Sequence, residues 1–229
     1  MNPILQKQPA YDVAVGQVAR NKVLRNTFWL LALSMIPTVL GAFVGVTMGM
    51  PMPAGFMGFI IFMAIAFGFM YAIEKTKESA LGVAVLLGFT FFMGLMLTPL
   101  LRHTLGYSNG GSLIMTAFGG TACVFAVMAS IATTTKRDFS GMASWLTAGA
   151  VVILLAIVAN IFLQMSALSI VISMLAIGIF SAFILYDVQR IINGGETNYI
   201  SATLAIYLDV YNIFTSLLHL LGIAGGDRD

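Results

Sequence analysis

Two aspartates are the most unusual residues in this chain, because both lie inside long apolar segments. Asp187 is near the end of the apolar segment 168–191, and Asp209 is well inside the segment 199–223. A carboxylate at bilayer depth costs about 2.5–3.5 kcal/mol on insertion scales, so such a residue is a functional candidate. At about 1.5 Å per helical residue, the two aspartates lie roughly 8 and 15 Å from one membrane face. Helix tilt would let their carboxyl groups meet.

Two carboxylates that share an apolar site cannot both remain ionised at low cost, so a proton or a cation has to accompany them. A hard cation such as Ca²⁺ prefers oxygen ligands. The sequence therefore predicts an ion-binding or pH-sensing site at Asp187 and Asp209, with both residues as candidate Ca²⁺ ligands. The alternative is two separate carboxyl groups, each hydrogen-bonded to a neighbouring helix.

Further polar residues follow in the last apolar segment. Asn212, Ser216 and His219 continue from the second aspartate at steps of three, four and three residues, which places them on one helix face. Asn160 and Gln164 form a shorter polar face on an earlier segment and could join it. The pattern predicts either a polar path through the protein or a structural network of interhelical hydrogen bonds.

Long apolar helices must position these residues. Of the 229 residues, 59% are hydrophobic and 9% are charged, against roughly 25% charged in a soluble domain. A membrane helix needs about 20 mostly apolar residues. Seven segments qualify: 27–48, 54–73, 80–100, 112–133, 142–164, 168–191 and 199–223. We predict an all-α integral membrane protein with a tail at 1–26, a seven-helix domain at 27–223 and a short tail at 224–229.

The distribution of basic residues predicts the orientation. Nine of the 11 Lys and Arg residues lie in the N-terminal tail and in the loops on its side of the membrane. Since cytoplasmic loops are rich in Lys and Arg, the N-terminus is predicted to be cytoplasmic and the C-terminus periplasmic. The net charge of +2 is too small and dispersed to favour a nucleic-acid partner.

The segment 112–133 carries small residues near one helix face. Such a row favours close packing against a neighbouring helix, although a pore-lining role is the alternative. The residues of this predicted packing face are Ser112, Thr116, Gly119, Cys123 and Ser130.

Several motifs resemble bacterial members of the Bax inhibitor-1 family, specifically its YccA branch. The resemblance covers almost the whole chain beyond residue 20. Its most specific motif is the loop Gly-Gly-Glu-Thr-Asn-Tyr-Ile at 194–200. The other motifs lie at 22–27, 119–121, 134–138, 159–164 and 211–214.

The resemblance implies six helices that surround a central seventh, in the bacterial inner membrane. It implies binding and modulation of the membrane-anchored AAA protease FtsH and its associated HflK–HflC complex. It also implies a pH-sensitive calcium leak at an aspartate pair, which Asp187 and Asp209 match. Two departures stand out: this chain has no Lys or Arg between Arg25 and Lys75, where some members place an arginine partner, and it has Thr98-Pro99 where Gly-Pro is frequent.

The function predicted first is therefore modulation of FtsH, and the alternative is a cation leak. A third interpretation is an intramembrane aspartyl protease, because Tyr186 precedes Asp187. Such enzymes carry Gly-x-Gly before the second aspartate, whereas the residues at 206–208 are Ile-Tyr-Leu. No phosphate loop, nucleophile elbow or zinc-binding helix occurs elsewhere. We predict a protein that is not an enzyme and has no cofactor, apart from Ca²⁺ as a bound or transported ion.

Overall fold

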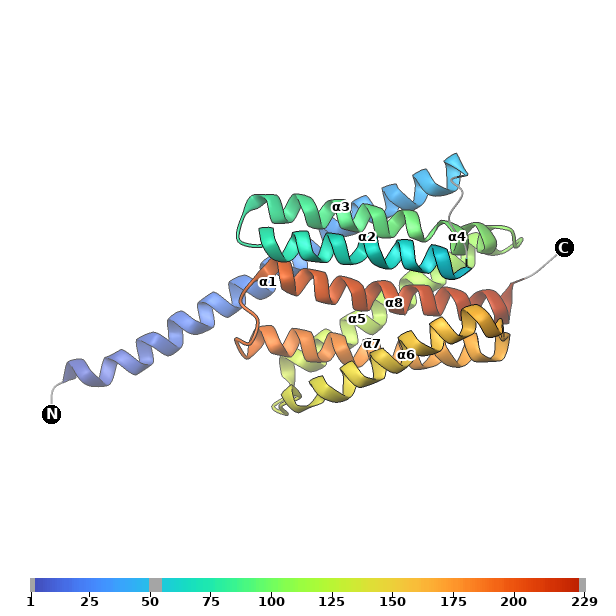
Figure 1. Cartoon of the computed structure of the whole chain (residues 1–229). Coiled ribbons are helices and arrows are strands. Elements are labelled where there is room, and N and C mark those ends of the chain that lie inside the picture. Colours follow the sequence, from blue (N-terminus) through green and yellow to red (C-terminus); the bar gives the residue numbers. More distant parts are fainter. Residues whose placement is uncertain (1–2, 50–54, 227–229) are drawn as a thin grey trace.

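The computed structural model describes residues 3–49 and 55–226, with side chains from residue 17 onward. Every regular element in these residues is helical (Figure 1). A short 3₁₀ turn at Ser140–Met142 precedes α6. The helices are α1 (Pro3–Met48), α2 (Gly55–Thr76), α3 (Ala80–Met96), α4 (Thr98–Leu105), α5 (Gly110–Thr134), α6 (Ala143–Leu163), α7 (Ser166–Ile192) and α8 (Tyr199–Gly225).

Length and composition suit these helices to a membrane. Six of them are long and apolar enough to cross it, and the bent pair of α3 and α4 makes a seventh span if it is counted as one. This confirms the predicted all-α membrane fold. The helix ends agree with the predicted segments to within a few residues, except in α1 and α3. The predicted start of the second segment, Ala54, lies outside the described residues.

The third predicted segment is not one continuous helix. α3 ends at Met96, and α4 begins at Thr98 after a bend of 40°. Pro99 lies in the first turn of α4. Proline has no N–H and its ring clashes with the carbonyl four residues earlier, so it suits a helix start and breaks a helix interior.

The first helix also differs from its predicted extent. α1 is helical from Pro3, so it continues through the predicted tail, and only Gln17–Met48 forms the apolar span. Figure 1 shows its N-terminal part extending beyond the bundle. The end of α8 lies at the opposite end of the bundle, as an odd number of spans requires.

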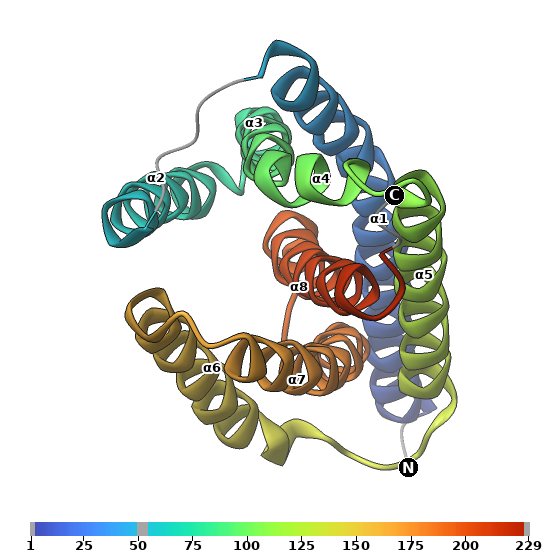
Figure 2. The ribbon, with the colours of Figure 1, turned by 90° about the vertical axis from the view of Figure 1, so that its right-hand side faces the viewer.

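The last helix occupies the centre, as predicted. Viewed along the bundle, the other helices surround α8 (Figure 2), and α8 contacts α1, α2, α3, α5 and α7. Tyr207, Ile206, Ile213 and Leu218 of α8 are fully buried. The Tyr207 hydroxyl lies 2.9 Å from the Thr38 hydroxyl of α1 and donates to a backbone carbonyl of α3. The central helix is therefore fixed by packing and by polar contacts to two neighbours.

Helices α1 and α3 approach closely because glycines face the contact. A Cβ placed on Gly94 would lie 2.8 Å from the carbonyl carbon of Thr38 and 3.0 Å from the amide nitrogen of Ala42. A Cβ on Gly41 would likewise collide with the carbonyl oxygen of Phe91. Glycine permits such backbone contact, which is how membrane helices gain packing energy when lipid offers no hydrophobic drive.

The predicted packing face of α5 is wrong. All five small residues proposed for it are exposed on the outside of the bundle, and Gly119 has open space where a Cβ would be. The buried face of α5 instead carries Leu113, Ala117, Thr121, Ala129 and Ala132. The packing face holds alanine and leucine, so residue size alone did not identify it.

Candidate functional site

The structure brings the two aspartates together. Helices α7 and α8 pack side by side, and the carboxyl groups of Asp187 and Asp209 lie close enough to interact electrostatically. An ionised carboxylate only accepts hydrogen bonds, so a bond between two carboxyl groups requires one of them to carry a proton. The pair can therefore hold a proton, or its oxygens can face a hard cation in the same place.

Asp209 is buried and incompletely hydrogen-bonded, whereas Asp187 is partly exposed. Asp209 is 5% exposed, and its Oδ2 atom has no hydrogen-bond partner among the described residues. Arg190, one turn after Asp187 on α7, and Glu196 are the charged groups outside the pair that act on Asp187. The Arg190 and Glu196 side chains lie 3.5 Å apart. Arg190 thus supplies a basic group near the pair, although none is present in the second predicted helix.

A loop network closes the bundle on the side of the aspartates. Asn198 caps α8 by accepting hydrogen bonds from the amides of Ile200 and Ser201, at 2.9 and 3.2 Å. Its side-chain amide donates to the Lys77 carbonyl and to Glu78, at 3.0 and 3.1 Å. The specific loop at 194–200 therefore ties the start of α8 to the turn between α2 and α3.

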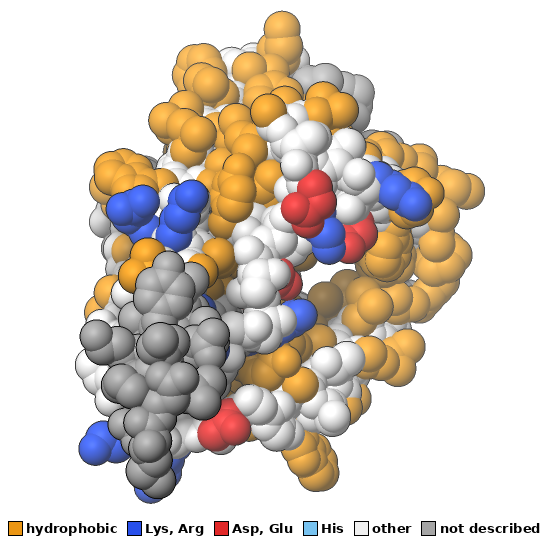
Figure 3. Space-filling view, turned by 90° about the vertical axis from the view of Figure 1, so that its left-hand side faces the viewer, with side chains coloured by type: hydrophobic (Ala, Val, Ile, Leu, Met, Phe, Trp, Pro, Cys, Tyr) orange, Lys and Arg blue, Asp and Glu red, His pale blue; other side chains and the backbone are white. Residues whose placement is uncertain are grey.

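Charged side chains gather on this end of the molecule (Figure 3). Gly194 has a φ of +77° and lies against the Arg20 guanidinium of α1, so a side chain here would be strained and would meet Arg20. The Glu74 carboxylate raises the pKa of Lys77 in the turn after α2. Through Arg20, α1 thus contacts the loop before α8.

A second set of hydrogen bonds, made by Gln189, holds the loop between α5 and α6. Gln189, buried on α7, accepts a hydrogen bond of 2.7 Å from the Phe139 amide and donates one of 2.6 Å to the Arg137 carbonyl. The hydroxyl and amide of Ser140 both donate to Asp138 and lower the pKa of that carboxyl group. Sequence reasoning missed Gln189, although an amide in an apolar helix was a usable signal.

The predicted polar stripe is divided by the fold. Asn212 donates to the Leu208 carbonyl of its own helix at 2.8 Å, and Ser216 is buried. His219 lies near the other end of α8, where its Nδ1 atom is 3.0 Å from the Ser173 hydroxyl of α7.

Apolar packing separates this polar contact from the aspartate pair. Ile184 on α7 and Ile213 on α8 stand at the intervening positions, and both are fully buried. Asn160 lines a pocket with His219. Gln164 is exposed, with a φ of 51° at the end of α6, and it does not belong to the pocket lining. The structure therefore contains two polar sites at different depths of the bundle.

Comparison with known proteins agrees with this architecture. The family described as inhibitor of apoptosis-promoting Bax1 matches residues 20–226. An uncharacterized protein of Pseudomonas aeruginosa is 42% identical over 205 residues, or 90% of each chain. The modulator of FtsH protease YccA of Escherichia coli strain K12 is 40% identical over 210 residues, which cover 92% of this chain and 94% of the relative. A Vibrio cholerae membrane protein is 37% identical over 205 residues, covering 89% and 90%.

The apolar helices that surround α8, which carries Asp209, define a multi-pass membrane protein. The extent of these matches shows that the chain belongs to the Bax inhibitor-1 family. The family prediction from the sequence motifs is thereby confirmed.

Proposed function

We propose that this protein binds and modulates the membrane-anchored AAA protease FtsH, with its HflK–HflC complex, at the bacterial inner membrane. The observation that carries the proposal is the 40% identity to the Escherichia coli modulator of FtsH protease over 92% of this chain. The alignment spans nearly all of both proteins, so it includes the membrane helices as well as the loops. The proposed role is quality control of membrane proteins.

The shape of the molecule supports this role. α1 extends beyond the bundle as a continuation of the first span, on the end where charged side chains gather (Figure 3). By the positive-inside rule, the excess of Lys and Arg on this end favours a cytoplasmic location for it and a periplasmic location for the end of α8. A cytoplasmic helix that projects from the membrane offers a partner a segment to grip without disturbing the bundle.

Co-purification from cross-linked membranes tests the proposal. A C-terminally tagged protein is expected to bring down FtsH, and removal of residues 2–20 is expected to reduce the recovered FtsH severalfold. The matched control is Asp209→Asn, which alters the buried pair and leaves the projecting helix unchanged. Recovery of no FtsH with the intact chain would refute the proposal, whereas full recovery with the shortened chain would refute only the role of α1.

We also infer that the protein is not an enzyme. The aspartate pair has a neighbouring arginine and no Gly-x-Gly before Asp209, and the related Escherichia coli protein is named as a modulator. Incubation of the purified protein with a transmembrane peptide is expected to yield no cleavage products. Cleavage that disappears in Asp209→Asn would contradict this inference.

A cation leak is the second candidate function, and the aspartate contact favours it. Two adjacent carboxyl groups with one unpartnered buried oxygen form a plausible place for Ca²⁺ or a proton. Because Ile184 and Ile213 are fully buried, conduction would require α7 and α8 to separate. The described conformation therefore corresponds to a closed state of such a leak.

Liposomes loaded with a calcium dye test this candidate. Flux is expected to depend on pH in the native protein and to lose that dependence in Asp209→Asn. Asp138→Asn is the control, since Asp138 is an acidic residue in an exposed loop. Equal flux and equal pH dependence in native protein and Asp209→Asn would eliminate the mechanism. The result leaves the FtsH proposal intact, because binding is measured separately.

A further inference from the structure

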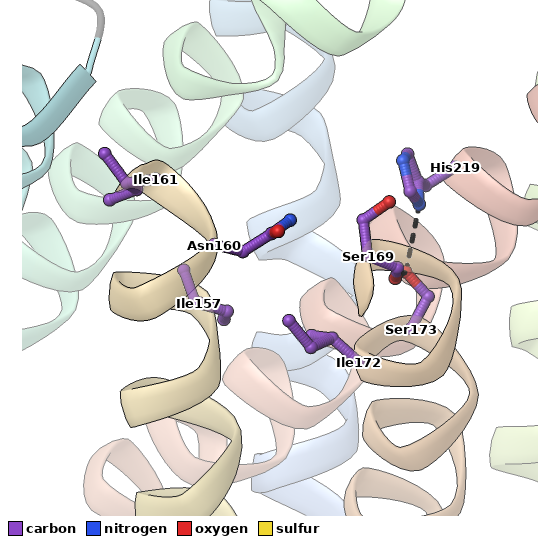
Figure 4. Close-up of a pocket in the computed structure, with 7 residues that line it drawn as sticks. All are labelled: Ile157, Asn160, Ile161, Ser169, Ile172, Ser173 and His219. Atoms are coloured by element: carbon purple, nitrogen blue, oxygen red, sulfur yellow. Dashed lines mark hydrogen bonds between the residues drawn. The ribbon is translucent and has the colours of Figure 1, made fainter. Parts of the chain in front are cut away.

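A pocket of about 290 Å³ lies among α6, α7 and α8, toward the end of the bundle opposite the aspartates. Figure 4 shows α6 on one side of the pocket and α7 on the other, with His219 of α8 next to Ser173. The lining combines apolar and polar side chains: Ile157, Asn160, Ile161, Ser169, Ile172, Ser173 and His219.

The pocket exists because α6 is poorly covered by the rest of the bundle. α6 packs along α7 and touches α2, where the rings of Phe56 and Phe162 are 5.3 Å apart. It has no contact with the central α8 in the described part of the chain. Only Leu146 and Ile153 of α6 are buried. The rest of the bundle therefore leaves most of the apolar surface of this helix uncovered.

The position of the lining residues near the ends of α6 and α7 favours a pocket at the level of the membrane interface. Asn160 is three residues from the end of α6, and Ser169 is three residues after the start of α7. At about 1.5 Å per residue, both lie roughly 5 Å inside the helix ends. The headgroup and interfacial regions account for about 10–15 Å of total bilayer thickness. This is the depth at which phosphate and ester groups of lipids are found.

Most polar groups of the pocket lining are already hydrogen-bonded within the protein, and the NH₂ group of Asn160 remains as a donor. The Asn160 Oδ1 atom accepts from the Met165 amide at 3.0 Å, which leaves its NH₂ group available. The Ser173 hydroxyl donates to the Ser169 carbonyl at 2.9 Å, so it accepts from Nδ1 of His219. Figure 4 shows the Asn160 side chain directed toward the space between α6 and His219.

We propose that this pocket binds the phosphodiester and glycerol region of a membrane phospholipid. Its acyl chain would lie along Ile157, Ile161 and Ile172 and cover the open side of α6. The lining contains no carboxylate and one titratable group, His219, so no anionic side chain there repels a phosphate, and the Asn160 amide supplies a donor. The volume is far larger than the roughly 30 Å³ share of one water molecule. This inference is independent of the proposed binding to FtsH.

Native mass spectrometry of the detergent-purified protein tests the assignment, with phosphatidylglycerol as the added probe. We expect one phospholipid per chain to survive mild delipidation. Ile161→Trp fills the pocket and is expected to lower lipid retention at least tenfold. Val152→Trp is the matched control, because Val152 is on the same helix and is 60% exposed. This variant is expected to retain lipid like the native protein.

A second variant keeps the test decisive if Ile161→Trp does not fold. Asn160→Leu keeps the side-chain size and removes the NH₂ donor, and about tenfold weaker retention is expected from the loss of one hydrogen bond to the charged phosphate. Equal retention in the native protein and both folded variants would overturn the proposal. So would thermal stabilisation by inorganic phosphate equal to that by phosphatidylglycerol, since the pocket would then bind a free anion.

Hydration provides a separate test of the same pocket. Ser169→Cys in a Cys123→Ser background places one thiol in the lining. Added phosphatidylglycerol is expected to slow its reaction with a water-soluble maleimide at least fivefold. A reaction rate that does not change with phospholipid would show a water-filled cavity and would overturn the assignment.

Discussion

Replacement of Gly94 by alanine is the most direct test of the packing described for α1 and α3. The added Cβ would lie 2.8 and 3.0 Å from backbone atoms of Thr38 and Ala42, and the backbone cannot rotate away as a flexible side chain can. Overpacking of this kind typically costs about 1–3 kcal/mol. The helical preference of alanine over glycine returns about 0.5–1 kcal/mol. A net loss of about 1–2 kcal/mol is therefore expected.

The measurement is the apparent Tm of the purified protein in one detergent. For chains of about 150–250 residues, 1 kcal/mol shifts Tm by about 2–4 °C, so Gly94→Ala is expected to melt about 2–8 °C lower. Gly119→Ala is the matched control, because a Cβ at Gly119 has open space. The control is expected to keep or slightly raise Tm. Equal shifts for the two variants would show that α1 and α3 do not make the backbone contact described.

Three further predictions concern the loops. Asn198→Ala removes the cap of α8 and is expected to lower stability by about 0.5–2 kcal/mol, measured as a lower Tm. Gln189→Leu leaves two loop backbone groups without their partner, at about 1–3 kcal/mol each, and faster proteolysis at 135–139 is expected. The Ser140 contacts lower the pKa of Asp138 below its usual 3.8. Their contribution is therefore present above that pH and lost as pH falls through the lower folded pKa. The rate of amide hydrogen exchange in the loop that contains Asp138, corrected for its intrinsic pH dependence, should rise as the pH falls below 3.8. Asp138→Asn should abolish this rise.

The helices were predictable because membrane spans are long and their interruptions are polar. The start of α8 at Tyr199 follows from the glycine pair and the capping Asn198, both visible in the sequence. The break at Thr98 was less visible, because Pro99 is compatible with either a helix end or a new start. The outward face of α5 was not predictable, since small residues suit both a packed face and a lipid-exposed one.

The aspartate contact was predictable as a possibility, because the high cost of buried carboxylates limits where they are placed. The division of the polar stripe was not predictable from spacing. The spacing places Asp209 and His219 on one face, but it does not reveal the buried Ile184 contributed by α7. Likewise, the pocket at Asn160 depends on α6 standing apart from α8, which is a property of tertiary packing.

The central position of α8 also constrains biogenesis, because α8 is made after the helices that surround it. The other helices enter the membrane before α8 fills the centre of their ring. Asp187 of α7 therefore enters before Asp209 is available to pair with it. Early termination of translation before residue 199 would therefore leave a hollow assembly rather than a slightly shortened protein. The bundle cannot be filled before α8 is made, so a stop codon just before residue 199 should be as damaging as one near the beginning.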